Sequence, residues 1–232
     1  MSRVAVVTGA AGAIGAAVVA RLADDGDDAV GLDVAPLPDG LVCDVSDEGA
    51  VAEAFAAIRA DHGPPTVLVN CAGIVGAGGV VDTEPDEWRR ILDVNLTSAF
   101  LCCREVIGDM QHAGGGRIVN VASVTGRLGG SALSGPAYAA SKGGLLTLTR
   151  FLASEHAVDR IGVNAVAPGP HDTAMWGSLD AEHRAAILDS VPSPEAPGDP
   201  SDLAAVVAFL CSPEARYITG ATLDVNGGQW MG

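Results

Sequence analysis

Residues 4–15 read VAVVTGAAGAIG, and this stretch decides the fold. Residues 3–7 form a short, continuous apolar run rich in Val, which is typical of a buried parallel strand. The glycine-rich turn that follows leads into an apolar helix expected over residues 13–23. Glycines permit a tight turn in which backbone N–H groups approach a pyrophosphate at the start of a helix. The stretch therefore predicts a strand, turn and helix that bind a dinucleotide.

A second strand, expected at residues 29–33, ends in the carboxylate of Asp33. An acidic residue about 20 positions after such a turn is placed to accept hydrogen bonds from the adenosine ribose hydroxyls. The same carboxylate would repel a 2′-phosphate, and Ala10, just past the first glycine, offers no cation to offset that repulsion. We therefore expect NAD rather than NADP. The alternative is that Asp33 is only a turn residue at the end of a strand.

The rest of the chain continues the alternation of strands and helices. Further strands are expected at residues 41–45, 66–70, 117–121, 161–166 and 221–225, and helices at residues 47–61, 84–92, 96–112, 138–156 and 201–211. This order predicts an α/β fold, a Rossmann-like doubly wound parallel sheet of about seven strands with helices on both faces. No linker divides residues 1–232, so we expect one NAD-binding domain, with a substrate lid at about residues 171–200.

Composition and charge exclude several classes of function. The formal net charge of −16 would repel nucleic acid and anionic membrane surfaces. No apolar run is long enough to span a membrane, and no signal peptide precedes the first strand, so we expect a soluble cytoplasmic protein. The five cysteines form no C-x-x-C pair, so neither a disulfide framework nor a metal site is expected.

Tyr138 and Lys142 are four residues apart in the helix expected over residues 138–156, so their side chains lie on one face. A free phenol titrates near pH ~10 and is a poor base at neutral pH. A neighbouring ammonium favours the phenolate, and we expect it to lower the pKa of Tyr138. The pair would then donate and accept protons at working pH. The spacing also arises by chance on helix surfaces, so the assignment depends on the other motifs.

Together, the motifs resemble the single-domain short-chain dehydrogenase/reductase family from Val4 to Gly228. The matching pieces are Thr8–Gly15, Asp44 with Val45, Asn70–Gly73, Asn95, Ser123, Tyr138 with Lys142, Pro168 with Gly169, and Asp224–Gly228. Each piece is modest alone, but their order and spacing are specific to this family.

The resemblance implies four catalytic residues. Tyr138 would be the general acid–base, and Lys142 would lower its pKa and hold the nicotinamide ribose. Ser123 would stabilise charge on the substrate oxygen, and Asn95 would anchor a proton path from Lys142 through its backbone carbonyl and a water. The implied cofactor-binding residues are Gly9, Gly12, Ala13, Ile14, Gly15, Asp33, Asp44, Val45, Asn70, Ala72, Gly73, Tyr138, Lys142, Pro168, Gly169 and Thr173. Alternatively, Ser123 only caps a turn and Asn95 only satisfies the backbone at a helix break.

The chain departs from the family pattern in three places. Ala13 stands where the family usually has glycine. The stretch from Ser123 to Tyr138 is longer than usual, so Ser131 or Ser134 is an alternative donor to the substrate. Cys71 replaces the second asparagine of the usual Asn-Asn-Ala-Gly motif.

The pocket walls are expected from residues 74–80, 125–136 and 170–190, which are mostly apolar or small. Substrate contacts are expected from Arg127, His171, Met175 and Trp176, although His171 has the plainer interpretation of a loop histidine. We therefore expect an NAD-dependent alcohol dehydrogenase or ketoreductase that interconverts a small, uncharged secondary alcohol and its ketone.

Three alternatives stay open at this point. The first is a reductase of 3-oxoacyl thioesters carried by acyl carrier protein or coenzyme A. The second is a nucleotide-sugar epimerase or dehydratase, which the short chain after Pro168 disfavours. The third is a non-catalytic NAD-binding or scaffold protein. The family resemblance also implies a homotetramer, with the apolar helix 96–110 and the Trp230-Met231 end as expected interface elements.

Overall fold

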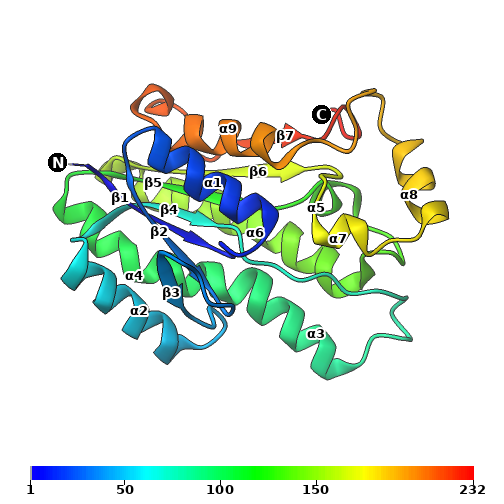
Figure 1. The fold of residues 1–232 in the computed structure, drawn as a ribbon, viewed down its shortest axis with the longest axis horizontal. Coiled ribbons are helices and arrows are strands. Elements are labelled where there is room, and N and C mark those ends of the chain that lie inside the picture. The colour runs from blue at the N-terminus through cyan, green and yellow to red at the C-terminus, as the bar shows by residue number, and fades with distance from the viewer. Residues whose placement is uncertain (1) are drawn as a thin grey trace.

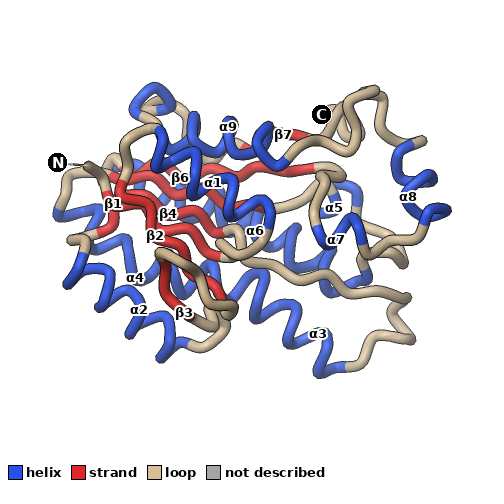
Figure 2. Tube along the Cα trace, in the orientation of Figure 1, coloured by secondary structure: helices blue, strands red, loops and turns tan. Residues whose placement is uncertain are grey.

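The computed structural model describes residues 2–232, and its centre is a seven-stranded parallel sheet (Figures 1 and 2). The strand order is β3-β2-β1-β4-β5-β6-β7. The strands are β1 (Val4–Thr8), β2 (Asp28–Asp33), β3 (Gly40–Val42), β4 (Pro65–Asn70), β5 (Gly116–Val121), β6 (Ile161–Pro168) and β7 (Thr222–Val225). This confirms the predicted Rossmann-like α/β fold, in which the order reverses beside β1 and places the glycine-rich turn near the centre of one edge.

Helices cover both faces of the sheet (Figures 1 and 2). One face carries α1 (Ala13–Asp24) and α9 (Pro200–Cys211), and the other carries α2 (Glu48–Asp61), α4 (Ser98–His112) and α6 (Gly135–His156). The shorter helices are α3 (Pro85–Leu92), the π-helix η1 (Asp93–Thr97), α5 (Thr125–Leu128), η2 (Ala157–Asp159), α7 (Ala174–Gly177), α8 (Ala181–Leu188) and η3 (Pro213–Ala215).

Each face of the sheet has its own apolar core. Phe55, Leu68 and Met110 are fully buried on the α2, α4 and α6 side. Leu22 and Leu210 are buried on the α1 and α9 side. Because helices cover both faces of the sheet, the side chains that point to either face are buried and apolar. This explains the continuous Val- and Ile-rich sequences of the strands.

Two predicted strands and one predicted loop differ from the structure. The third strand ends at Val42 because Asp44 turns the chain by accepting hydrogen bonds from the backbone and hydroxyl of Ser46. Strand β6 continues through Pro168, which needs no N–H at its terminal position. The expected loop 124–136 contains α5 and the start of α6, and the expected lid 171–200 contains α7 and α8.

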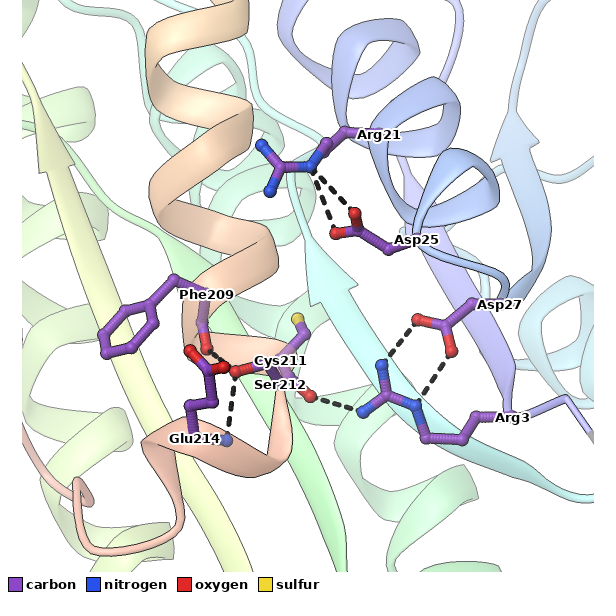
Figure 3. Close-up of polar contacts among 8 residues, drawn as sticks. All are labelled: Arg3, Arg21, Asp25, Asp27, Phe209, Cys211, Ser212 and Glu214. Atoms are coloured by element: carbon purple, nitrogen blue, oxygen red, sulfur yellow. Dashed lines mark hydrogen bonds and ion pairs between the residues drawn. The ribbon is translucent and has the colours of Figure 1, made fainter.

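Arg3, directly before β1, connects the chain before β2 with the end of α9 (Figure 3). Its guanidinium forms two hydrogen bonds with the Asp27 carboxylate, at 2.8 and 2.7 Å, and a third with the backbone oxygen of Cys211 at the end of α9. The Asp27 side chain is only 5% exposed. In the neighbouring ion pair, Arg21 lies in the last turn of α1 and Asp25 caps that helix. Each of these two side chains is 42% exposed.

Arg3→Ala is expected to lower the free energy of unfolding by about 2 kcal/mol, because it leaves a buried carboxylate and a helix-end carbonyl without a partner. Arg21→Ala is the matched control and is expected to cost only about 0.3 kcal/mol, because exposed i,i+4 pairs contribute little. Urea unfolding of both variants measures the difference. Equal losses would show that the Arg3 contacts do not stabilise the sheet edge.

Candidate active site

The glycine-rich turn between β1 and α1 is tight because two glycines permit close backbone contacts. Gly9 has φ +69°, and a Cβ there would lie 2.8 Å from the backbone of Ala72. A Cβ at Gly15 would overlap the carbonyl of Gly9. The helix begins at Ala13, so the methyl that replaces the family's usual glycine is accommodated at the start of α1.

Thr8, which the sequence analysis did not assign, ties this turn to the end of β4. Its hydroxyl oxygen accepts hydrogen bonds from the backbone N–H groups of Cys71 (3.0 Å) and Ala72 (3.1 Å). Burial raises the pKa of the Cys71 thiol to about 11, so this thiol stays protonated at neutral pH. The threonine directly before the first glycine was the available sequence signal for this contact.

Asp33 stands at the end of β2, beside the glycine-rich turn. Its carboxylate accepts hydrogen bonds from the backbone N–H groups of Ala11 and Ala35, each at 2.9 Å. These two contacts hold a negative charge against the turn. Asp44 is exposed and accepts hydrogen bonds from Ser46, whereas the side chain of the next residue, Val45, is buried.

The Asn70 side chain points into the protein, so any contact of this residue with the cofactor would be made by its backbone. Its amide donates to the Asn120 side-chain oxygen at 2.8 Å, and Asn120 donates to the Thr149 hydroxyl at 2.9 Å. This buried chain of polar groups connects β4 and β5 with helix α6. Asn120 and Thr149 were missed, although an asparagine inside the apolar run of β5 was a visible signal.

Asn95 lies in the π-helix η1, at the position where the sequence predicted a helix interruption. Its side chain is only 1% exposed. The side-chain oxygen Oδ1 accepts a hydrogen bond from the N–H of Ile74 at 2.8 Å, and the side-chain nitrogen Nδ2 donates to the carbonyl of the same residue at 2.9 Å. Nδ2 also donates to the Ser141 hydroxyl at 3.0 Å, which in turn donates to the backbone oxygen of Tyr138 at 2.8 Å. Asn95 therefore joins the loop after β4 to helix α6.

Tyr138 and Lys142 lie side by side on α6. The Lys142 ammonium is 5.8 Å from the centre of the Tyr138 ring and donates to the backbone oxygen of Val121 at 2.8 Å. It also faces Gly73, where a Cβ would lie 3.3 Å from Nζ. The pair is therefore close to the strand end that contacts the glycine-rich turn.

Burial dominates the electrostatics of this pair. Lys142 is only 4% exposed, and burial lowers its pKa to about 8. Burial raises the pKa of Tyr138, while its interaction with Ser123 acts in the opposite direction. The pKa of Tyr138 is therefore raised in this structure and not lowered as predicted, because desolvation of the phenol outweighs the opposing contact with Ser123.

Ser123 is the hydroxyl beside Tyr138. It is 7% exposed at the end of β5, and its oxygen accepts from the N–H of Thr125 at 3.1 Å. The longer stretch before Tyr138 forms α5 and a compact turn in which the Ser134 hydroxyl donates to the carbonyl of Ser131. The N–H of Gly78 donates to Ala132 at 2.8 Å, so this turn packs against the loop after β4.

The segment after β6 begins at Gly169, whose N–H donates to the carbonyl of Val225 at 3.0 Å. The carbonyl of Pro168, the last residue of β6, accepts from the N–H of Val124 at 2.9 Å. His171 is 6% exposed, with Nδ1 3.1 Å from the carbonyl of Gly169. Thr173 caps α7, and its hydroxyl donates to the carbonyl of His171. His171 and Thr173 therefore shape the backbone at the start of this segment.

The Arg127 guanidinium is engaged by residues of β7. It pairs with Asp224 on β7 at 3.3 Å and approaches the carbonyl of Thr222 at 3.4 Å. A substrate contact by Arg127, as expected from the sequence, would therefore be made by a guanidinium that is already paired with a carboxylate. Trp176 is buried, whereas Met175 is 41% exposed.

Within residues 2–232, no group of three or more His, Cys, Asp or Glu side chains is arranged to hold a metal ion. None of the helices in this range is both long and apolar enough to cross a membrane.

Comparison with known proteins supports the same family along the whole chain. A family model described as enoyl-(acyl carrier protein) reductase matches residues 9–229. The 3-oxoacyl-[acyl-carrier-protein] reductase FabG of Vibrio cholerae serotype O1 is 38% identical over 241 residues, which cover 99% of this chain and 98% of the relative. FabG of Escherichia coli (strain K12) is 37% identical with the same coverage. MabA of Mycobacterium bovis, also named a 3-oxoacyl-[acyl-carrier-protein] reductase, is 37% identical over 237 residues, which cover 100% of this chain and 94% of the relative.

The depressed pKa of Lys142 predicts a stability change with pH. The native pKa is about 8, while an unfolded lysine titrates near ~10.4. Between these values the unfolded chain binds more protons, so this residue makes wild-type stability rise with pH. We compare wild type with Lys142→Met by subtracting the variant's free energy of unfolding from that of wild type. This difference should increase by about 2–3 kcal/mol from pH 8 to pH 10.

The subtraction removes the opposing effect of the buried cysteines, which are common to both proteins. Urea unfolding at several pH values gives the two curves. A difference that stays flat across this range would show that Lys142 titrates normally in the folded protein.

Proposed function

We propose, on the premise that this chain belongs to the short-chain dehydrogenase/reductase family, that it reduces the 3-oxo group of an acyl thioester to a 3-hydroxyl group. As a member of this family with a Rossmann-like fold, the chain is an oxidoreductase that binds a nicotinamide cofactor. The observation that carries the proposal is the buried arrangement of Tyr138 beside Ser123 and Lys142. The names of the relatives favour a 3-oxoacyl substrate over the small alcohol expected from sequence.

In the proposed reaction the nicotinamide, when bound, supplies the hydride that attacks the carbonyl carbon. Tyr138 donates its phenolic proton to the carbonyl oxygen, and Ser123 donates a hydrogen bond to the same oxygen as charge develops there. The raised pKa of Tyr138 keeps the phenol protonated and ready to donate.

Lys142 and Asn95 complete the proposed proton path. Lys142 stays mainly protonated at neutral pH, because its pKa of about 8 is above 7, and its charge stabilises the phenolate left by proton transfer. Tyr138 is then reprotonated through Lys142, with Asn95 holding the adjacent loop and helix in register. The cofactor-binding roles of the glycine-rich turn and of Pro168, Gly169 and Thr173 remain part of this proposal.

NAD is the proposed cofactor because Asp33 holds a carboxylate beside the turn that would receive the adenosine ribose. A 2′-phosphate would meet this negative charge at short range. Asp33 is fixed by two backbone N–H groups, so turning it away would cost those hydrogen bonds.

The second candidate function is the interconversion of a small secondary alcohol and its ketone. The exposed apolar side chains of Leu128 and Met175, which lie on α5 and α7, would fit a small uncharged substrate as well as an acyl chain. A third candidate is a non-catalytic NAD-binding or scaffold protein, which a measured turnover with any substrate would exclude.

We further propose that residues 1–232 act as one cytoplasmic domain with a lid at residues 171–200, and that the chain assembles as a homotetramer. Helices α4 and α6 support self-association, because Phe100 is 48% exposed and Phe151 is 61% exposed. A groove between these helices is lined by Leu96, Thr97, Phe100, Gly144 and Leu148.

A substrate panel tests the proposed function. NADH oxidation, followed by absorbance, is expected to be at least about tenfold more efficient with a 3-oxoacyl N-acetylcysteamine thioester than with simple cyclic or linear ketones, because tenfold corresponds to only about 1.4 kcal/mol of transition-state binding. The reverse order would favour the small-ketone candidate. No oxidation with any substrate would reject both.

Asp33→Ser is expected to raise the ratio of kcat/KM for NADPH to that for NADH by about tenfold or more, since removing a close like charge is worth about 1.4 kcal/mol or more. Asp61→Ser removes the same charge at the exposed end of α2 and is the matched control. Steady-state kinetics with both cofactors gives the ratio. An unchanged ratio in Asp33→Ser would reject the assigned role of this carboxylate.

A further inference from the structure

We infer that the acyl group reaches this active site on a carrier without a large negative charge, so that acyl carrier protein and coenzyme A thioesters are poor substrates. The inference rests on the proposed reduction of a 3-oxoacyl group and narrows its substrate class. It differs from the carrier that the names of the relatives state for those proteins.

Three segments, residues 74–93, 125–136 and 170–199, contain the helices near the carboxyl edge of the sheet. Figure 1 shows their helices α3, α5, α7 and α8 on the same side of the molecule. These segments together hold eleven Asp and Glu residues but only four Arg and no Lys. We call them the rim. Its charge has the same sign as the net charge of −16 of the whole chain.

Two of the four rim arginines are already paired with carboxylates. Arg127 contacts Asp224 at 3.3 Å, and Arg89 contacts Asp86 at 2.6 Å. Within residues 2–232, Arg90 and Arg184 have no carboxylate within ion-pair distance, which leaves two arginines to meet an incoming anion. His183 is also engaged, since its ring contacts Asp180 at 2.7 Å.

Some rim carboxylates lie directly on the loops that border the catalytic residues. A Cβ built at Gly76 would lie 3.3 Å from a Glu87 carboxylate oxygen and 3.6 Å from the carbonyl of Ser134. Glu87 therefore sits where the loop after β4 meets the turn before Tyr138. Asp172 is exposed at the start of the segment after β6.

Exposed apolar side chains also lie in the rim. Leu128 is 49% exposed and Met175 is 41% exposed. Such side chains fit an acyl chain or a neutral thioester arm. They provide no charge-assisted hydrogen bond for a phosphate or for a carrier's carboxylates.

The physical consequence is electrostatic repulsion during association. Charges separated by less than about 10 Å are only partly screened at 0.1 M salt, and fields of this kind change association rates by about 10-fold to 1,000-fold. An acyl carrier protein is acidic, and coenzyme A carries phosphates, so both meet a rim of like charge. A neutral thioester does not.

The experiment compares one 3-oxoacyl group on three carriers: N-acetylcysteamine, coenzyme A and acyl carrier protein. The wild-type kcat/KM is measured with NADH at 20 mM and 300 mM NaCl. The neutral thioester should be preferred and should change by less than twofold with salt. The two anionic substrates should be slower and should become at least threefold more efficient at high salt.

A carrier-protein thioester that is preferred, and whose kcat/KM falls with salt, would overturn the inference while leaving the proposed 3-oxo reduction intact. Failure of the neutral thioester together with the other two would instead reject the proposed function itself. The two failures are therefore distinguishable.

A charge reversal at the rim provides the second readout. Glu87→Lys should raise the ratio of anionic to neutral substrate efficiency at low salt by at least threefold. Glu53→Lys makes the same charge change on α2, on the other side of the molecule in Figure 1, and should leave that ratio within twofold of wild type. Equal ratios in the two variants would contradict a role for the rim charge.

Discussion

A buried ammonium, Lys142, is the constraint around which this active site is built. Its Nζ donates to the last carbonyl of β5, that of Val121, while its position on α6 keeps it beside the Tyr138 ring. The lowered pKa of about 8 shows that burial makes its charge costly, by about 3 kcal/mol relative to an ordinary lysine. The hydrogen bond to Val121 offsets that cost only if the end of β5 and helix α6 keep their relative positions. The position of Lys142 therefore depends on the packing of α6 on the sheet.

Several polar contacts hold α6 in this position relative to the sheet. Asn95, in its π-helical turn, joins the loop at Ile74 to Ser141 on α6. The buried Asn70, Asn120 and Thr149 side chains connect β4 and β5 to the same helix. Thr8 brings the glycine-rich turn against the end of β4. These contacts place the glycine-rich turn and the Tyr138–Lys142 pair at one edge of the sheet, where ligands bind in folds of this kind.

The sequence predicted the fold and the position of Tyr138 beside Lys142 because the signals for both are local. Apolar strand runs, the glycine pattern and the four-residue spacing of Tyr138 and Lys142 all follow from short-range geometry. It did not predict the long-range partners of these residues. The pairing of Arg127 with Asp224, the inward direction of Asn70 and the raised pKa of Tyr138 depend on what surrounds each side chain after folding. Helices α5 and α7 were missed because four residues give too little periodicity, and α8 was missed although it is as long as the predicted helix α3.

The most direct test of the proposed mechanism is a single-turnover measurement of hydride transfer from NADH in Tyr138→Phe. The account predicts that the rate falls by at least about a thousandfold, within the range that a positioned proton donor contributes, while NADH binding measured by fluorescence stays within about threefold, roughly 0.7 kcal/mol. Hydride transfer at the wild-type rate in this variant would contradict the assignment of Tyr138 as the proton donor.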